Sequence, residues 1–369
     1  MSVHYIYIDD DPNSNNKIQG FEKKDHLSIE TVQHEDSWEL QMVFLKQKES
    51  SIDGLILDLK LDDLPNKNDQ RANFRGTSLA QEIRTRQKEG VLNSFPIVLF
   101  SANDKIKLSL ENSGKDLFDI CIDKSNISIE SFSYYTPKLI ALAEGYKTIT
   151  DSKQLNNVFN QEVSYLDSRF VSEYEKIKCS PTHVQARFLI TEFLEKQGLL
   201  IDEDVLASRL GIDKTSSQDW ELLKAKLSCV QYRGVFCEGW QRWWAHMVEI
   251  WWNNEVISET SLRSLSAHNR VDYIKESTGL GKLQAAERIE KCDSEEFWTI
   301  CKAYNRPLDP IDGLLIEDQD NLYPWQEPEY VSIDAALKKR NVELWHGIAD
   351  VEKGRFDELK EVYSHRKQQ

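Results

Sequence analysis

Five polar side chains in the first third of the sequence have the chemistry that phosphoryl transfer requires. They directly follow apolar runs, and they are Asp9 with Asp10, Asp58, Ser101 and Lys124. Clustered carboxylates repel one another unless a cation neutralises them, and hard oxygen ligands favour Mg²⁺. A carboxylate beside the metal can attack a phosphoryl group, while an ammonium and a hydroxyl group bind its oxygens. Brought together, these residues would form a magnesium-dependent site with a carboxylate nucleophile.

Alternating strands and helices would bring these side chains to one place. Five apolar runs are typical of buried strands, and they cover residues 3–8, 27–32, 53–58, 95–102 and 117–123. Segments with helical spacing separate or follow them, at 37–48, 76–90, 104–114 and 134–147. Parallel strands need crossover connections and are buried on both faces. We therefore predict an α/β fold with a doubly wound, five-stranded parallel sheet, whose carboxyl edge carries the five polar residues.

The order of these residues resembles that of receiver domains of two-component response regulators, which have a flavodoxin-like fold. The resemblance covers residues 1 to about 147 and rests on YIYIDDD, LILD, GTSLAQEIR, PIVLFSA and DICIDK. It implies that Asp58 accepts the phosphoryl group from a histidine kinase or a phosphotransfer protein. Ser101 would bind a phosphoryl oxygen and shift on activation, and Lys124 would pair with the phosphoryl group. The implied Mg²⁺ ligands are Asp9, Asp10, Asp58 and the backbone carbonyl of Lys60.

Three features depart from the receiver pattern. Cys121 stands where the family usually has an aromatic residue three positions before the lysine, and Phe118 is the candidate to substitute for it. Ser125 replaces the proline that usually follows the lysine. Residues 61–75 lengthen the loop after Asp58 well beyond the few residues that usually join a strand to a helix. We expect this loop to overhang the site, where it could select the phosphodonor or slow hydrolysis.

From about residue 150 onward the apolar spacing is mainly helical. We expect a receiver domain over residues 1–147, a helical linker over 148–180 and a mainly α-helical output domain over 181–369, with a further division into 181–305 and 306–369. Residues 155–177 have the spacing of one amphipathic helix. The segment 234–254 holds five of the ten tryptophans, and we interpret it as a helix with a buried aromatic face. An exposed face for a protein partner is the alternative.

Several functions stay open for the C-terminal region. The first is a protein-interaction output that phosphorylation switches, and the second is DNA binding through a helix-turn-helix near 186–227. The candidate recognition helix offers only Lys224 and Lys226 beside two acids, without arginine or asparagine for base edges, so DNA is the less expected partner. A third is a phosphate sink without output. Divergent receivers with long helical tails also look like parts of two-component-like bacterial anti-phage systems. In such systems some receiver proteins act as phosphate sinks.

Composition limits these alternatives. The 369 residues are 40% hydrophobic and 29% charged, as in a globular protein of two or three domains. The net charge of −16 disfavours a nucleic-acid backbone as the main partner. With no signal peptide and no apolar run of about 20 residues, we expect a cytoplasmic protein without a membrane partner. The six cysteines form no CxxC pair and are expected to be reduced. A homodimer stays open, and no catalytic motif points beyond self-phosphorylation and dephosphorylation of the receiver.

Overall fold

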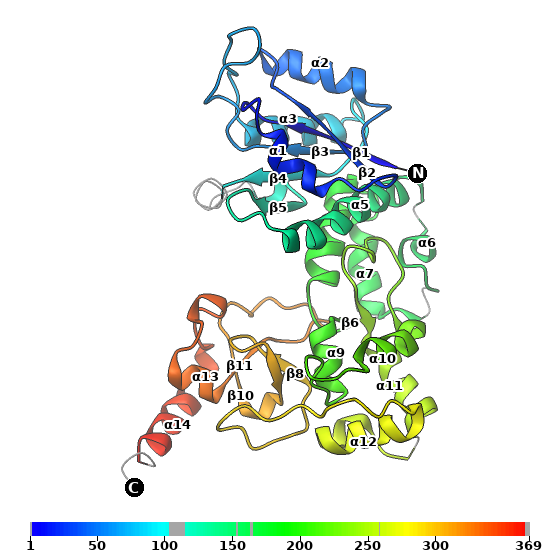
Figure 1. The fold of residues 1–369 in the computed structure, drawn as a ribbon, viewed down its shortest axis with the longest axis vertical. Coiled ribbons are helices and arrows are strands. Elements are labelled where there is room, and N and C mark those ends of the chain that lie inside the picture. Colours follow the sequence, from blue (N-terminus) through cyan, green and yellow to red (C-terminus); the bar gives the residue numbers. More distant parts are fainter. Residues whose placement is uncertain (1, 103–114, 153, 163–164, 258, 366–369) are drawn as a thin grey trace. The chain divides into compact units, whose positions relative to one another are not determined.

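The computed structural model describes residues 2–102, 115–152, 154–162, 165–257 and 259–365 (Figure 1). The chain divides into two compact units, which we describe separately. The first comprises Met1–Thr191 and Arg233–Trp240, and the second comprises Glu192–Tyr232 and Gln241–Gln369. The expected boundaries at 147 and 180 both lie inside the first unit, and the expected division at 305 lies inside the second. The linker and output roles of these ranges stay predictions.

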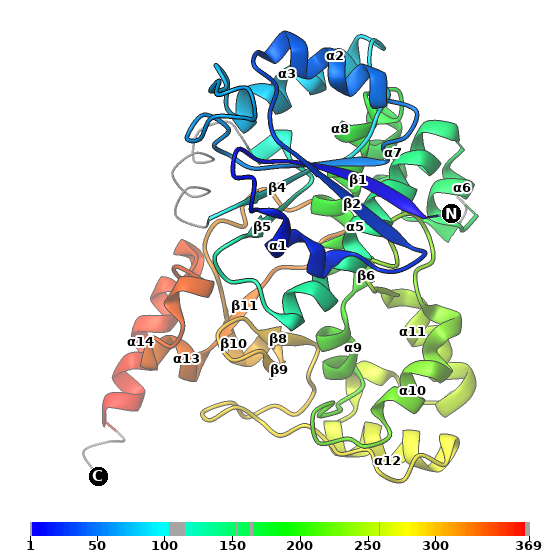
Figure 2. The ribbon, with the colours of Figure 1, turned by 45° about the horizontal axis from the view of Figure 1, so that its top comes forward.

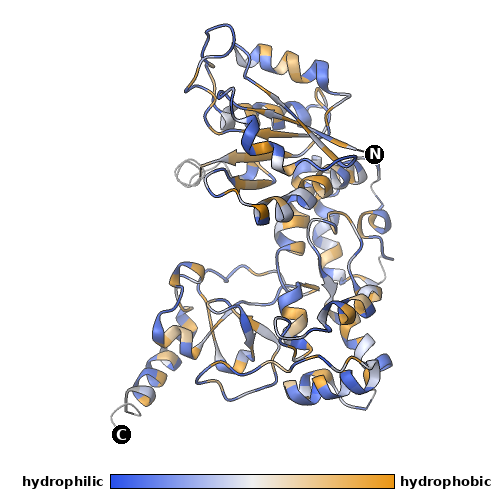
Figure 3. Cartoon of the chain, viewed as in Figure 1, coloured by the Kyte–Doolittle hydropathy of each residue, from blue (hydrophilic) through white to orange (hydrophobic). Residues whose placement is uncertain are grey.

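A five-stranded parallel sheet forms the centre of the first unit (Figures 1 and 2). Its strands are β1 (Val3–Ile8), β2 (Leu27–Val32), β3 (Gly54–Leu57), β4 (Ile97–Ser101) and β5 (Ile120–Asp123). The order β2-β1-β3-β4-β5 is the doubly wound order of flavodoxin-like proteins, which confirms the predicted fold. Hydrophobic residues concentrate on these strands (Figure 3). Both faces of such a sheet are buried, and apolar runs of the chain therefore lie in these strands.

Helices cover the two faces of this sheet. They are α1 (Asn15–Ile18), η1 (Gln19–Phe21), α2 (Trp38–Lys48), α3 (Gly76–Lys88), η2 (Lys115–Leu117) and α5 (Ile129–Asp151). Leu45 of α2 and Ile83 of α3 pack in one cluster with Leu57 of β3. On the other face Phe21 packs against Phe132 of α5 with ring centroids 4.8 Å apart. The helix expected at 104–114 lies outside the described residues.

Three short helices extend the first unit beyond α5. They are α6 (Leu155–Phe159), α7 (Ser168–Ile177) and α8 (Thr182–Phe188). The prediction of one helix over 155–177 is wrong, because Asn160 adopts a left-handed conformation (φ 46°) that ends α6. The rings of Phe159, Phe170 and Tyr174 nevertheless pack together, so the apolar spacing did mark a buried face.

The second unit combines helices with two small sheets. Its helices are α9 (Glu203–Arg209), α10 (Trp220–Lys226), α11 (Ala245–Trp251), α12 (Ala267–Thr278), α13 (Ile333–Lys338) and α14 (Lys353–His365). Its strands are β6 (Leu200–Ile201), β7 (Trp243–Trp244), β8 (Thr299–Cys301), β9 (Arg306–Leu308), β10 (Gly313–Leu315) and β11 (Tyr330–Ser332). The four-stranded sheet β10-β11-β8-β9 adds to the expected helical content and was not predicted, since strands of three residues carry no readable alternation.

The tryptophan-rich segment is core, as expected, but it is not one helix. Trp243 and Trp244 form β7, which pairs with β6, and α11 begins only at Ala245. Trp251 and Trp252 are buried as well. Ten residues separate the end of α9 at Arg209 from the start of α10 at Trp220. A helix-turn-helix has a turn of only about three or four residues, so these two helices do not have its spacing.

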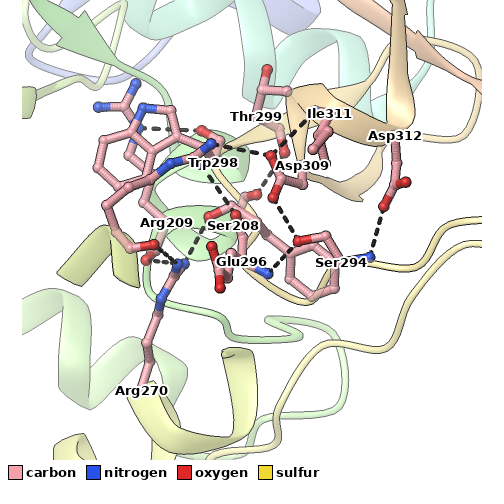
Figure 4. Close-up of polar contacts among 12 residues, drawn as sticks. Ser208, Arg209, Arg270, Ser294, Glu296, Trp298, Thr299, Asp309, Ile311 and Asp312 are labelled. Carbon is pink, nitrogen blue, oxygen red and sulfur yellow. Dashed lines mark hydrogen bonds and ion pairs between the residues drawn. The ribbon is translucent and has the colours of Figure 1, made fainter. Parts of the chain in front are cut away.

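A buried arginine ties helices to the sheet of the second unit (Figure 4). Arg270 of α12 is fully buried and donates to the carbonyls of Arg209 (2.9 Å) and Phe297 (2.7 Å). Ser208 of α9 donates to the carbonyl of Thr299 in β8 (2.6 Å). Burial lowers the pKa of Arg270 to about 10, with repulsion from Arg263 as the second cause. Across the described residues, no helix is both long and apolar enough to cross a membrane.

Candidate functional site

The predicted site residues gather at the carboxyl edge of the first unit's sheet. Asp9 and Asp10 follow β1, Asp58 follows β3, Ser101 ends β4 and Lys124 follows β5. The three carboxylates and Ser101 are buried, with at most 6% of each residue exposed. The backbone N–H of Lys124 donates to the Ser101 carbonyl (2.9 Å), which places the ends of β4 and β5 side by side. The structure therefore brings these five side chains together at one edge of the sheet.

Lys124 neutralises the buried acids. Its Nζ makes an ion pair with Asp9, and it lies 3.4 Å from Oδ1 of Asp58. Burial by itself lowers the pKa of Lys124, but the charges of Asp58 and Asp9 outweigh it, and the net shift is upward. The side chain is 16% exposed, so this cation is held largely away from water. A cation in this position can exchange its carboxylate partner for an incoming anionic group.

Asp9 has further partners that the sequence reading missed. The hydroxyl of Tyr7 donates to Oδ2 of Asp9, and the backbone N–H of Asp11 donates to Oδ1 (2.9 Å). Burial raises the pKa of Tyr7, and the charge of Asp9 raises it further, so the phenol stays a donor. The spacing contained a signal, because Tyr7 and Asp9 are two residues apart and side chains in a strand alternate between faces.

Asp58 is held by main-chain contacts. Its N–H donates to the Ile8 carbonyl (3.0 Å), and its Oδ2 accepts from the N–H of Lys60 (2.8 Å). Gly76, the first residue of α3, lies against it so closely that a Cβ there would overlap the carbonyl oxygen of Asp58. The sequence reading noted this glycine only as the start of a helix. Its actual role is to let α3 approach the strand that carries the candidate nucleophile.

The long loop over residues 61–75 is tied to the acidic pair. The backbone N–H of Leu64 donates to Oδ2 of Asp10 (2.6 Å). Asn66 donates to Asp36 (2.7 Å) and to the carbonyl of His34 (3.2 Å), so the loop reaches the connection that follows β2. Burial raises the pKa of Asp10, and the Leu64 amide offsets part of that shift. The loop thus stabilises the charged form of a predicted metal ligand.

The donor chemistry of the site fits a divalent cation. Asp9, Asp10 and Asp58 supply hard carboxylate oxygens, and Asp10 is both buried and repelled by Asp9, so a cation would relieve it. Within the described part of the chain, no three acidic, histidine or cysteine side chains are already arranged as a metal cage. Mg²⁺ usually keeps several waters and takes only one or two protein carboxylates, so it does not require one.

The hydroxyl of Ser101 is available for a ligand. Its Oγ is buried and has no hydrogen-bond partner among the described residues. Buried hydroxyls are normally satisfied, and an exception next to a charged cluster marks a place where a further acceptor belongs. Cys121, the residue in the usual aromatic position, is exposed, while Phe118 is buried. The residue in the usual aromatic position is therefore neither aromatic nor buried.

Comparisons with known proteins concern this unit. No protein-family model matches the chain, and no curated protein matches its sequence. A solved receiver domain protein from Clostridium thermocellum shares 15% identity over 37% of this chain and 94% of its own, with a TM-score of 0.27. A CheY-like receiver domain from Methylobacillus flagellatus shares 18% over 36% and 92%, with a TM-score of 0.26. The Mn²⁺-bound form of response regulator Rcp1 shares 19% over 36% and 87%, with a TM-score of 0.24.

At these TM-scores the likenesses carry no argument about this chain. The fold of the first unit rests on its strand order, because β2-β1-β3-β4-β5 is also the order in flavodoxin and CheY. The acids after β1 and β3, the hydroxyl at β4 and the lysine after β5 occupy its carboxyl edge. The first unit of this chain therefore has the doubly wound, flavodoxin-like fold, with the predicted site residues at its carboxyl edge.

Proposed function

We propose that the protein is a response regulator of a two-component system, in which Asp58 accepts a phosphoryl group from a histidine kinase or a phosphotransfer protein. The observation that carries this proposal is the position of Lys124, which pairs with both Asp9 and Asp58 at the carboxyl edge of the sheet. A lysine with a purely structural role does not need two buried acids, whereas Lys124 contacts two that follow different strands. A phosphoacceptor needs such a cation, because it must bind a group of higher negative charge than its own carboxylate.

The reaction follows from the chain's own groups. A carboxylate oxygen of Asp58 attacks the phosphorus of the donor, the new O–P bond forms, and the bond to the leaving group breaks with its electron pair. Lys124 then pairs with a phosphoryl oxygen, and Ser101 Oγ donates to another. Bound Mg²⁺ would neutralise charge on the phosphoryl oxygens, with Asp9, Asp10, Asp58 and the carbonyl of Lys60 as its protein ligands.

The loop over residues 61–75 acts on the same site through Asp10. By donating to Oδ2, the Leu64 amide fixes one oxygen of this carboxylate and orients the other. Such outer contacts typically change metal affinity by about 10–100-fold when they are removed. We therefore assign the loop a positioning role for the metal, in addition to any control over which phosphodonor reaches Asp58.

Phosphorylation of the intact protein tests the proposal. Wild type incubated with acetyl phosphate and Mg²⁺ should gain the mass of one phosphoryl group, and it should bind beryllofluoride. Asp58→Asn should do neither, and EDTA should abolish both. Asp63→Asn is the matched control, since this exposed acid lies five residues further on and its side chain pairs with that of Lys60. A mass gain that persists in Asp58→Asn, or is absent in wild type, would refute the assignment.

We further propose that phosphorylation switches a protein-interaction output in the second unit. Affinity capture with wild type and Asp58→Asn, each with beryllofluoride, identifies the partner as one that only activated wild type retains. A partner captured equally by both proteins argues against a switched output. The cytoplasm, where two-component phosphotransfer takes place, is the proposed location.

A further inference from the structure

An eight-residue stretch, Arg233–Trp240, leaves the second unit and packs within the first. We call it the return segment. Its neighbours on both sides, Tyr232 and Gln241, belong to the second unit, so the chain passes between the units three times. Only three residues after the return segment the chain enters β7, the tryptophan strand of the second unit. A displacement of the return segment would therefore reach β7 of the second unit directly through the main chain.

The return segment fits closely against α5. The ring of Phe236 lies on Gly145, where a Cβ would overlap the ring, and a Cβ at Gly239 would lie 2.9 Å from Cα of Lys138. Phe236 and Trp240 are each only 3% exposed. Glycine in a helix interior costs about 1 kcal/mol relative to alanine, so Gly145 weakens α5 but makes room for the ring.

A buried cation adds to this contact. Lys138 of α5 is 8% exposed, and its Nζ lies 4.7 Å from the ring centroid of Trp240 and 4.0 Å from that of Tyr134. Cation–π contacts gain strength when they are shielded from water. The backbone also takes part, since the N–H of Val235 donates to the carbonyl of Val158 (2.8 Å). The return segment is therefore held by shape, charge and a main-chain hydrogen bond together.

The backbone of the return segment is strained at Phe236, and a cavity lies beside the ring of this residue. Phe236 has a φ of 67°, a left-handed conformation that bulky residues adopt only when their surroundings impose it. A cavity of about 240 Å³ lies next to the ring and is lined by Ala141, Asn157, Arg233 and neighbouring residues. The left-handed φ of Phe236 and the cavity beside its ring would both favour movement of the return segment.

A short series of contacts joins the surface of α5 that holds Phe236 to the proposed phosphorylation site at Asp58. Tyr146, the neighbour of Gly145 in α5, donates its hydroxyl to Asp119 (2.5 Å). Asp119 immediately precedes β5, and β5 ends one residue before Lys124. Lys124 must change partners when Asp58 carries a phosphoryl group. Movement at Lys124 therefore reaches α5 through one short strand and one partly buried hydrogen bond.

We propose that the return segment is an internal latch, which α5 holds in the unphosphorylated protein and releases when Asp58 is phosphorylated. Its occupant is this chain itself, so the receiver acts first on its own second unit. This inference rests on the proposed function, because it needs phosphorylation of Asp58 as the trigger. It goes further in naming the surface, the segment and the direction of the switch.

Hydrogen exchange on the full chain tests the latch. Beryllofluoride with Mg²⁺ should speed exchange over residues 233–240 by about tenfold or more, since local opening governs exchange there. Gly145→Ala should give fast exchange without beryllofluoride, because the new methyl group unseats Phe236. Gly354→Ala in α14 is the matched control, since a Cβ at that helical glycine meets nothing, and it should leave exchange over 233–240 at the wild-type rate.

Intact mass after acetyl phosphate separates the two hypotheses. If wild type gains a phosphoryl group and exchange over 233–240 stays unchanged, the latch is wrong and the proposed function stands, with a phosphate sink then favoured. If wild type gains no phosphoryl group, both fail. If Gly145→Ala exchanges like wild type, the close contact with Phe236 does not hold the segment, and the latch is wrong as well.

Discussion

Replacing Lys124 by methionine tests the electrostatics of the site most directly. At an effective dielectric constant of about 20, unit charges at the 3.4 Å between Lys124 Nζ and Asp58 Oδ1 attract by about 5 kcal/mol. The cost of burying the ions offsets part of this gain, and loss of one partner of a buried pair costs about 3–5 kcal/mol. Because the acids can also take up protons, we expect Lys124→Met to lower the stability of the first unit by about 3 kcal/mol at pH 7 without divalent metal.

Native-state hydrogen exchange of the β4 and β5 amides in the full chain measures this loss, since a chain of two units need not unfold in one step. Lys147→Met is the matched control. Lys147 pairs with Asp53 at 2.6 Å but is 49% exposed, so its loss should cost no more than about 1 kcal/mol. A loss below about 1 kcal/mol in Lys124→Met as well would show that the acids do not depend on this cation, and would refute the reasoning.

Metal and pH give two further readouts of the same variant. Mg²⁺ should restore stability to Lys124→Met more than it stabilises wild type, since it replaces the missing charge. The pKa of Lys124 is raised in the folded protein, because the charges of Asp58 and Asp9 outweigh its burial. Its stabilisation is therefore fully present below the unfolded lysine value of about 10.4 and disappears as the pH rises through the folded value. Wild type and Lys124→Met should converge in stability above that range.

Three other substitutions test separate parts of the two units. Gly76→Ala should slow phosphorylation by acetyl phosphate and destabilise the first unit by about 1–3 kcal/mol, because its Cβ overlaps the carbonyl of Asp58; unchanged rates would contradict the close contact. Arg84→Met should cost about 3–5 kcal/mol by leaving the buried Asp119 carboxylate (2.8 Å) without its cation, measured by exchange in β5, whereas a surface-like loss would count against a buried pair. Arg270→Lys should destabilise the second unit by about 2 kcal/mol, because one ammonium cannot replace both Nη1, which donates to the Arg209 and Phe297 carbonyls, and Nη2, which donates to the Arg263 carbonyl (3.4 Å); wild-type exchange protection in α12 would argue against these contacts.

The first unit could be predicted because its strands are apolar runs and its site residues have distinctive chemistry. The central strands β1, β3 and β4 are largely buried apolar runs, and side-chain type marks Asp58, Ser101 and Lys124 at the ends of strands. The contacts that the sequence did not reveal use the main chain or the absence of a side chain. The Leu64 amide on Asp10 and the approach of Gly76 to Asp58 depend on how the backbone is placed. No residue type announces such contacts.

The second unit was harder for a different reason. Its four-stranded sheet is made of strands of three residues, and the tryptophans near 243 belong partly to a two-residue strand and partly to a helix. Aromatic density predicted burial there but not the element, since large rings are buried in either conformation. Tertiary pairing between segments far apart in sequence decides the structure at these positions.

The three chain crossings also constrain how the protein can be synthesised. The parallel sheet and α5 have been synthesised once residue 151 has left the ribosome, but the surface of α5 around Gly145 stays uncovered until the return segment at residues 233–240 follows. At about 5–20 residues per second, the interval of roughly 90 residues lasts on the order of 5–20 seconds. During that time an apolar helix face is open to chaperones or to neighbouring chains. A gene fragment that stops before residue 240 would keep that face open permanently.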